Sequence, residues 1–453
     1  MSRTPLVNTR FAEKGAPYDF RWRTGYIRLP RRWGERTNGT SKQPGWQQVI
    51  AGDFWTAYGE AAKTAVGFFW KSGWAFVLGY FISAMIQAFV PKGRLTPYLG
   101  NAGFKSVGLA TVFGAISSSC SFAALAAARA LVMKGAHFVA AIAFMFASTN
   151  LVIELGILIL IFLGWQFLAA EIIGGLVLIA ISRVLVVWTY PTSWRDAARE
   201  KVESESEEET EDFDWRQRIR SAEGWRLVGH KFAGEWAMVW EEIAIGFTVA
   251  GFVAALVPDA FWKTIFLADA AAADPMYFPV VLENALLAPF VAAATFIGSM
   301  GNIPLATVLN ASGVLFAGIM GFIYSDLMVP PLVAVNARYY GWRSALYIAA
   351  VMYVSIVATA LILHYAFTVF GITPESARAV EDVAQFKLDY TFWMNLAAGG
   401  MAAALLWLNH AWHRRNEGMA MDMGGGLFKK ITARVTVGAL ILGGTVHLCI
   451  RFF

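Results

Sequence analysis

The sequence predicts an all-α polytopic integral membrane protein with about ten transmembrane helices, built from two related halves that contain broken or re-entrant helices. Three observations lead to this fold class. Of the 453 residues, 57% are hydrophobic and 15% are charged, and the mean hydropathy is +0.51. Apolar segments of membrane-spanning length follow one another along the chain, and a polar interruption of one segment recurs in altered form further on.

The composition excludes an ordinary water-soluble protein, because too few side chains are polar to cover a water-facing surface of this size. Several apolar stretches approach the roughly 20 residues that a helix needs to cross the hydrocarbon core of a bilayer. They are residues 74–90, 107–128, 151–181, 243–258, 286–309, 344–370, 391–408 and 432–450. Some of them are long enough or broken enough to hold two helices, which raises the expected number to about ten.

The polar interruptions repeat with a shift of 178 positions (313 minus 135). Residues 117–121 and 148–150 break the apolar sequence of the first half, and 298–302 and 325–326 break that of the second. The shift brings four residues onto four others, namely Gly135, Phe138, Phe144 and Ser148 onto Gly313, Phe316, Phe322 and Asp326. Irregular backbone inside a membrane is tolerated only where it is buried in protein or lines a cavity. The two pairs of breaks therefore predict a substrate site between the halves, as in a transporter.

Composition divides the chain into five segments. Residues 1–63 are a basic tail and an interfacial helix, without the apolar core of a cleaved signal peptide. The two halves are residues 64–190 and 236–370, and a charged, acidic linker, 191–235, separates them. Residues 371–453 add two transmembrane helices that have no counterpart in the first half. Basic residues flank the spans on both sides, so the sidedness of the N-terminus is left open.

The first break contains the residue types of a binding site. Serine hydroxyls can satisfy the backbone groups that an unwound helix frees, and small residues let helices approach closely. Cys120 is the softest ligand of the segment, and its thiolate would bind a soft centre such as Cu(I) or trivalent arsenic. The structural alternatives are a helix–helix seam of small residues for the serines and an inert buried thiol for Cys120.

The other breaks add polar side chains of a different character. The carboxamide of Asn302 and the carbonyl group freed by Pro304 offer hard oxygen ligands, which makes the two halves chemically unequal. The candidate substrate-binding residues from all the breaks are Ser117, Ser118, Ser119, Cys120, Ser121, Ser148, Thr149, Asn150, Asn302, Pro304 and Ser325.

Ionisable residues inside apolar segments are costly in lipid and are therefore functional candidates. Asp326 ranks first, because it occupies the repeat position of Ser148 and precedes Pro330-Pro331, which must break the helix. In the structural alternative, Arg129 neutralises Glu154 or Asp326 and only holds the fold together. The candidates for proton coupling or intramembrane charge are Arg129, Glu154, Glu283 and Asp326, and the same rule selects Glu171 and Glu242.

A loop between the last two apolar stretches contains His410, His413, Met419, Met421 and Met423. Methionine and histidine are ligands for soft metals, so this loop is a secondary candidate for a metal-collecting site. The favoured alternative is a Gly-rich loop with incidental methionines. The sequence contains no Walker A motif, nucleophile elbow, His-Glu-x-x-His motif or Cys-x-x-Cys pair. We therefore expect neither an enzyme nor a bound cofactor.

The break motifs resemble those of a known family. Similar motifs occur in the bacterial predicted-permease family that includes the organoarsenical efflux permeases: Ser119-Cys120-Ser121, the run from Gly135 to Phe144, Ala147-Ser148-Thr149-Asn150 and Gly301-Asn302-Ile303-Pro304. The resemblance covers residues 64–190 and 237–370. It implies a two-half membrane permease with a variable hydrophilic linker, which exports trivalent organoarsenicals such as methylarsenite. In the family the cluster often reads Cys-Ser-Cys, and Ser118 stands here in place of the first cysteine.

Residues and resemblance together predict a multi-pass permease of the bacterial inner (plasma) membrane. It would export a small solute, a trivalent organoarsenical or a similar soft compound, by proton-coupled alternating access. Cys120 would contact the substrate near the midplane, and Glu154 or Asp326 would bind the proton. The expected partners are the small-molecule substrate and the lipid bilayer, with no nucleic acid, and a homo-oligomer is left open. Two alternatives are a permease for another small solute or soft metal ion, and a non-transporting membrane scaffold.

Overall fold

Helices form all the regular structure in the part of the chain that the structure, a computed structural model, describes. The described residues are 54–89, 99–117, 121–133, 135–189, 215–295, 297–374, 380–383, 386, 388–415 and 427–452, and all of them belong to one unit, residues 43–453. The first helices are α2 (Phe54–Phe89), α3 (Phe104–Ser117), α4 (Ser121–Met133), α5 (Phe138–Asn150), α6 (Ile153–Phe162) and α7 (Trp165–Thr189).

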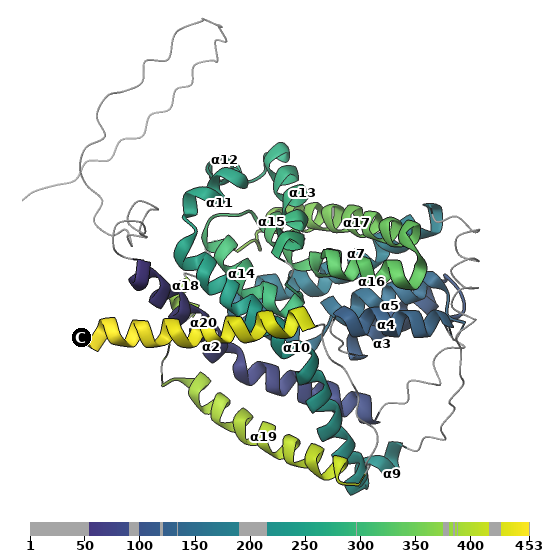
Figure 1. The fold of residues 1–453 in the computed structure, drawn as a ribbon. Helices are drawn as coiled ribbons and strands as arrows, with labels where there is room; N and C mark the ends of the chain where they lie inside the picture. The colour runs from purple at the N-terminus through teal and green to yellow at the C-terminus, as the bar shows by residue number, and fades with distance from the viewer. Residues whose placement is uncertain are drawn as a thin grey trace, which may run out of the picture. The chain divides into compact units, whose positions relative to one another are not determined.

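The middle of the chain forms the next set of helices, shown in teal and green in Figure 1. They are α9 (Trp215–Arg220), α10 (Ala222–Leu256), α11 (Asp259–Ile265), α12 (Ala268–Ala273), α13 (Phe278–Thr295), α14 (Ser299–Ala311), α15 (Phe316–Ile323), the 3₁₀ helix η2 (Tyr324–Met328), α16 (Pro330–Tyr340) and α17 (Trp342–Val369). The last helices are α18 (Val380–Val383), α19 (Tyr390–His413) and α20 (Leu427–Phe452).

The described residues contain seven helices that are long and apolar enough to cross a membrane: α2, α7, α10, α13, α17, α19 and most of α20. Two bent pairs, α5 with α6 and α15–η2 with α16, raise the number to nine if each pair is one span. This is fewer than the ten that the sequence predicts. Helices α3, α4 and α14 have 13 or 14 residues, about 20 Å of helix against a hydrocarbon core of roughly 30 Å. The number ten stays a prediction.

Local sequence explains the two bends, which are both 42°. Val329 is extended (φ −61°, ψ 138°), and Pro330 then begins α16, where the missing N–H of a proline leaves no hydrogen bond unmade. The prolines therefore end one helix and start the next, as the sequence predicts. At the other bend, Asn150 ends α5 and Val152 is extended (φ −95°, ψ 147°) before α6 begins.

The short helices after the breaks have matching bounds. Helices α4 and α14 have 13 residues each, and they begin at Ser121 and Ser299, which are 178 positions apart. Both ends of α5 and of α15–η2 show the same shift. The turns that precede them also agree, because Gly135 and Gly313 have φ values of 91° and 90°, which side-chain-bearing residues rarely adopt. The local backbone is thus alike at both places.

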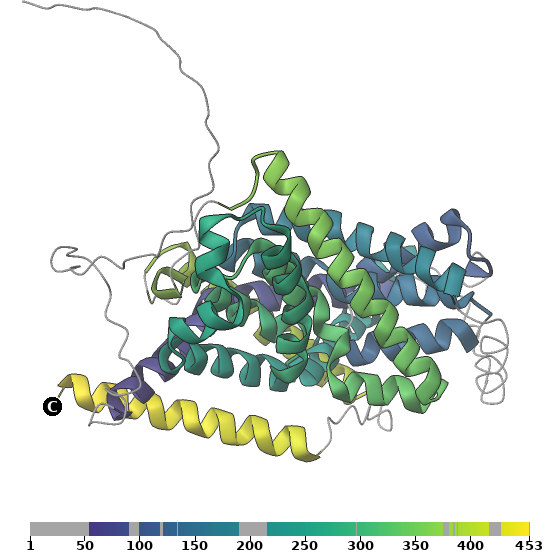
Figure 2. The same cartoon turned by 90° about the horizontal axis from the view of Figure 1, so that it is seen from above.

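Helices α2 and α10, 36 and 35 residues long, pack along one another. Small residues bring the helices close: Gly251 of α10 lies against Ala65 of α2, and Gly246 of α10 lies against Gly301 of α14. Helices α19 and α20 in turn pack against both α2 and α10. Figures 1 and 2 both show α20, in yellow, crossing the N-terminal part of α2, in purple. The C-terminal helices, which the sequence analysis treats as an addition, therefore lie against the two longest helices.

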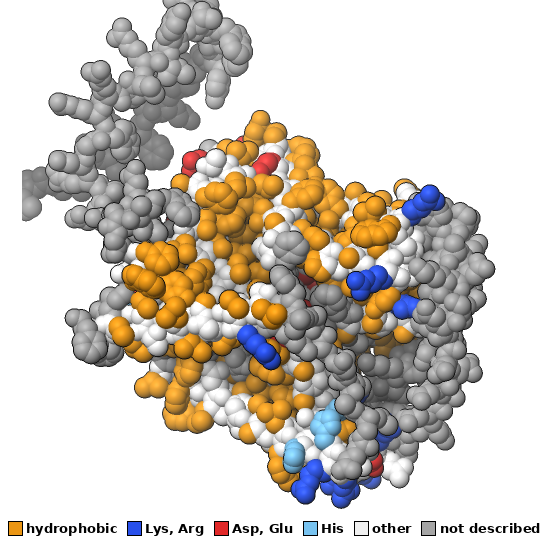
Figure 3. Space-filling model, in the orientation of Figure 1, with side chains coloured by type: hydrophobic (Ala, Val, Ile, Leu, Met, Phe, Trp, Pro, Cys, Tyr) orange, Lys and Arg blue, Asp and Glu red, His pale blue; other side chains and the backbone are white. Residues whose placement is uncertain are grey.

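The surface is largely hydrophobic. Figure 3 shows apolar side chains over much of the described face, with most of the visible lysines and arginines in its lower and right parts. Exposed tryptophans include Trp188 on α7 and Trp393 and Trp407 on α19, with exposed fractions of 81%, 66% and 70%. Water-soluble monomers rarely expose contiguous apolar surface on this scale, whereas lipid chains cover it favourably.

The Asn395 side chain of α19 forms two hydrogen bonds with the backbone of α2. The Asn395 amide accepts a hydrogen bond from the Trp74 backbone N–H at 2.9 Å and donates one to the Trp70 carbonyl oxygen at 2.7 Å. These two backbone groups would pair with one another in a regular α-helix. Gly73 leaves the room for this approach, because a Cβ atom there would lie 3.2 Å from the Asn395 Oδ1 atom. Asn395 therefore bridges the backbone of α2 from a neighbouring helix.

We expect Asn395→Leu to lower the free energy of unfolding by about 1–3 kcal/mol, because it removes both hydrogen bonds between α19 and the backbone of α2 at a partly buried place. Unfolding in mixed micelles of increasing denaturing-detergent fraction, followed by circular dichroism, measures this change. Leu396→Ala, on the same helix at a position with an exposed fraction of 62%, is the control. Equal effects of the two substitutions would contradict a bridging role.

Candidate functional site

Three buried side chains from distant parts of the sequence meet in one cluster. The Ser121 hydroxyl donates a hydrogen bond to Oδ2 of Asp326 at 3.1 Å, and the Oγ atoms of Ser121 and Ser299 lie 3.5 Å apart. Ser299 also lies close enough to interact with the same carboxyl group. Asp326, Ser121 and Ser299 have exposed fractions of 0%, 2% and 8%. We call these three residues the serine–aspartate cluster.

Two helix N-termini contribute to the serine–aspartate cluster. Ser121 is the first residue of α4 and Ser299 is the first residue of α14. The N-terminus of a helix carries unpaired N–H groups and a partial positive charge, which favour a carboxylate. Gly298, the N-cap of α14, offers no side chain, and the Glu242 carboxyl of α10 occupies the space that a Cβ atom there would need. Both helix ends therefore lie next to acidic side chains.

Two opposing effects act on the Asp326 carboxyl group. Burial in an apolar bundle disfavours its anion, because the anion loses its hydration. The Ser121 hydroxyl and the nearby helix N-termini favour the anion, because the hydroxyl donates a hydrogen bond to it and the helix ends place partial positive charge beside it. The Oδ1 atom accepts no hydrogen bond from the described residues. A carboxyl group in such a balance can take up and release a proton when its surroundings change.

Asp326 does not lie alone among buried carboxyl groups. Glu171 of α7, with an exposed fraction of 1%, is close enough to interact electrostatically with it, and so is Glu242. The sequence rule for ionisable residues selects all three, but their proximity could not be read from the sequence. Like charges at close range oppose simultaneous ionisation, so this group favours fewer than three negative charges.

The candidate residues of the first break have different positions. Ser117, at the end of α3, is buried, and Ser118, Ser119 and Cys120 lie outside the described residues. Ser118, Ser119 and Cys120 therefore stay predictions. Their place in the chain is nevertheless close to the serine–aspartate cluster, because Ser121 follows Cys120 directly. Their roles can be tested by substitution.

The residues of the second break mostly satisfy their own helix. The Ser148 and Thr149 hydroxyls both donate to the Met145 carbonyl oxygen, at 3.0 Å and 3.3 Å. The Asn150 Nδ2 group donates to the Phe146 carbonyl oxygen at 3.2 Å, while its Oδ1 atom has no partner among the described residues. Of the three residues, Asn150 retains an unused polar atom.

The candidates of the second half are buried as well. The Asn302 side chain accepts a hydrogen bond from the Thr295 hydroxyl at 3.4 Å, and its Nδ2 group has no partner in the described part of the chain. Pro304 lies buried inside α14. The Ser325 hydroxyl donates to the carbonyl oxygen of Gly321, one turn earlier. Asn302 therefore keeps an unused donor, whereas Ser325 stabilises the helix that precedes η2.

The remaining charged candidates lie on several elements. The Arg129 guanidinium group lies over the Tyr339 ring, 4.6 Å from its centroid, and Glu154 is buried against Gly79 of α2. The Glu283 carboxyl accepts a hydrogen bond from the Asn284 amide at 2.9 Å. Asp326 accepts its hydrogen bond from Ser121, a residue of the break at 117–121.

The predicted metal-collecting loop lies partly outside the described residues, which exclude Met419, Met421 and Met423. His413 packs edge-on against His230 of α10, with ring centroids 5.2 Å apart, and the His230 ring also stacks on Trp412. His410 is exposed. No group of three or more His, Cys, Asp or Glu residues within the described ranges has the geometry of a metal site.

Ser299 and His230 are not among the residues predicted from the sequence. Ser299 could have been found, because it stands 178 positions after Ser121 and so occupies the repeat position of a selected serine. His230 gives no such signal, since it lies in the N-terminal part of α10, far in sequence from His413. Only tertiary packing brings these two histidines together.

A sequence model of a family described as predicted permeases matches residues 57–365, from the start of α2 to near the end of α17. The chain is also 36% identical over 329 residues to Rv2963 of Mycobacterium tuberculosis (strain ATCC 25618 / H37Rv), a protein that carries the description of a permease. This match covers 70% of the present chain and 79% of the relative. No solved structure matches the chain. The chain therefore belongs to the predicted-permease family and is a multi-pass membrane transporter.

Proposed function

We propose that this permease exports a small solute, a trivalent organoarsenical or a similar soft compound, by alternating access coupled to proton entry. The observation that carries the proposal is the hydrogen bond between Ser121 and Asp326, which joins a break of the first half to a break of the second. A substrate held between these breaks would touch both parts of the protein that must move relative to one another.

The matching helix bounds support two related halves, and one contact adds a geometric argument. Ser121 and Ser299 occupy equivalent positions, and their hydroxyl oxygens lie 3.5 Å apart. In an object with approximate two-fold symmetry, only residues near the axis can touch their own equivalents. The serine–aspartate cluster would therefore lie at the axis between the halves, where transporters with inverted repeats bind substrate and coupling ion.

The proposed coupling group breaks this symmetry. The repeat partner of Asp326 is Ser148, so only one of the two equivalent positions carries a carboxyl group. Burial favours the protonated form of the carboxyl, and the Ser121 hydrogen bond favours the deprotonated form, so the two forms suit different surroundings. Proton binding at Asp326 would thereby favour one arrangement of the halves over the other.

In this proposal, Cys120 determines which substrate binds. It precedes Ser121 directly in the chain, and a thiolate binds trivalent arsenic or another soft centre better than a hydroxyl does. Asn302, whose Nδ2 group is unused, would add a hydrogen bond to the polar part of the substrate. Serines 117–119 complete the proposed lining.

The proposal predicts uptake of trivalent methylarsenite into everted membrane vesicles that contain the protein, driven by an acidic interior. Export from a cell appears as uptake in this preparation, and an uncoupler that collapses the proton gradient should reduce uptake to the level of vesicles without the protein. Uptake that ignores the gradient would overturn proton coupling. Proton-driven flux of another soft solute without methylarsenite uptake would overturn the substrate, and the absence of any flux would favour a scaffold.

A further inference from the structure

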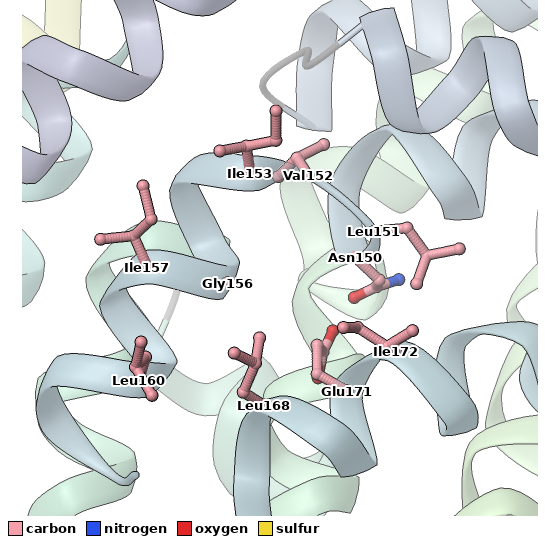
Figure 4. Close-up of a pocket in the computed structure, with 10 residues that line it drawn as sticks. All are labelled: Asn150, Leu151, Val152, Ile153, Gly156, Ile157, Leu160, Leu168, Glu171 and Ile172. Carbon is pink, nitrogen blue, oxygen red and sulfur yellow. The ribbon is translucent and has the colours of Figure 1, made fainter. Parts of the chain in front are cut away.

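A cavity of about 270 Å³ lies between the α5–α6 break and α7, and none of the three residues of the serine–aspartate cluster lines it (Figure 4). Apolar side chains such as Leu151 and Leu168 form most of its wall. Ile153, Leu160 and Ile172, which also line it, are 47%, 43% and 52% exposed. Since the flanking helices are candidate membrane spans, the mouth of the cavity opens between spans toward the lipid chains.

Two polar side chains interrupt this apolar wall. Asn150 and Glu171 each have an exposed fraction of 1%. The Asn150 Oδ1 atom and both carboxyl oxygens of Glu171 have no hydrogen-bond partner among the described residues. Figure 4 shows the Asn150 amide, at the end of α5, and the Glu171 carboxyl group, on α7, turned toward one another. Three acceptors without a donor thus belong to two residues that line the cavity.

Buried acceptors without a donor are rare in native proteins and call for a specific cause. Here the missing group must supply several hydrogens to one small region and, when Glu171 is ionised, a positive charge. A lipid acyl chain would fill the apolar part of the cavity and leave all three acceptors unpaired. An ammonium group has three N–H donors and one positive charge, so it satisfies both requirements.

We propose that this cavity binds a small apolar amine, with the ammonium group between Asn150 and Glu171 and the hydrocarbon part against α6 and α7. A dry cavity of about 150 Å³ holds benzene, so the present volume suits an amine with about ten non-hydrogen atoms. Binding at this site does not rest on the proposed transport function, because it requires neither the serine–aspartate cluster nor a proton gradient.

The test uses the full chain in lipid nanodiscs and radiolabelled 2-phenylethylamine as the probe. 2-Phenylethanol and propylbenzene have the same number of non-hydrogen atoms as the probe, but they lack the charge and, for propylbenzene, every donor. We expect the amine to bind about tenfold or more tightly than propylbenzene, with the alcohol between them. Equal competition by all three molecules, or no saturable binding of the amine, would overturn the proposal.

Two variants separate the polar end from the apolar wall. Glu171→Gln keeps the size of the side chain and removes its charge, so amine affinity should fall about tenfold while 2-phenylethanol affinity changes little. Leu168→Trp fills the cavity and should weaken all three molecules. The control is Ile173→Trp on the same helix, at a position that is 49% exposed and does not line the cavity. Unchanged amine affinity in Glu171→Gln would contradict the proposal and would indicate an apolar cavity that is filled by lipid chains.

Discussion

Asp326→Asn is expected to uncouple transport from the proton gradient while the protein stays folded. Asparagine has nearly the same shape and can still accept the Ser121 hydrogen bond, but it cannot bind a coupling proton. Gradient-driven uptake into everted vesicles should fall about tenfold or more and become insensitive to an uncoupler. Counterflow of substrate between the two sides, which needs no proton movement, should continue.

Asp269→Asn is the matched control, because Asp269 lies exposed on α12 and loses the same charge. It should leave both the rate and its dependence on the gradient unchanged. A second test moves the carboxyl group to the other half by combining Asp326→Ser with Ser148→Asp. Recovered coupling in this double variant would support the two-half repeat, whereas undiminished coupling in Asp326→Asn would remove Asp326 from the mechanism.

Cys120→Ser is expected to reduce uptake of trivalent methylarsenite by about tenfold or more. A serine hydroxyl is close in size to the thiol, but it is a hard ligand that does not ionise near neutral pH, so it cannot replace the arsenic–sulfur bond. Initial rates over a range of methylarsenite concentrations measure the change, which should be a loss of apparent affinity while the protein level in the membrane stays constant.

Cys449 supplies the control for this substitution. It is the other cysteine of the chain, it is exposed, and it lies on α20, beyond the residues that match the permease family. Cys449→Ser should transport methylarsenite at the rate of the unchanged protein. Equal losses in both variants would indicate a general effect of thiol removal, and no loss in Cys120→Ser would contradict a bond between substrate and Cys120.

The sequence predicts the broad fold because hydropathy and helix breaking are local properties. The mean hydropathy requires a bilayer, and Pro330-Pro331 ends a helix wherever it stands, since proline lacks the N–H that a helix interior needs. The break at Ser148–Asn150 was also located correctly. The number of spans was not confirmed, because hydropathy does not distinguish a span from two short helices such as α3 and α4 that reach only part of the way across.

The arrangement of the candidate site is harder to predict from the sequence. Asp326 could be selected because a carboxyl group in an apolar segment is exceptional by itself. Its contact with Ser121 depends on how two distant segments pack, and no periodicity encodes that. The same holds for Glu171 and Asn150, which come from different helices and share one cavity. Sequence identified the unusual residues, and tertiary structure determines which of them are neighbours.

The contact between Ser121 and Ser299 has a consequence for the transport cycle. If the two halves exchange conformations between the inward-open and outward-open states, a contact between equivalent residues is mapped onto itself and persists. The bond from Ser121 to Asp326 is instead mapped onto a pairing of Ser299 with Ser148, which carries no charge. In such a cycle, the hydrogen bond that changes between the two end states would be the one that involves the ionisable group. The proposed function would then link the protonation of a single side chain to the direction in which the permease faces.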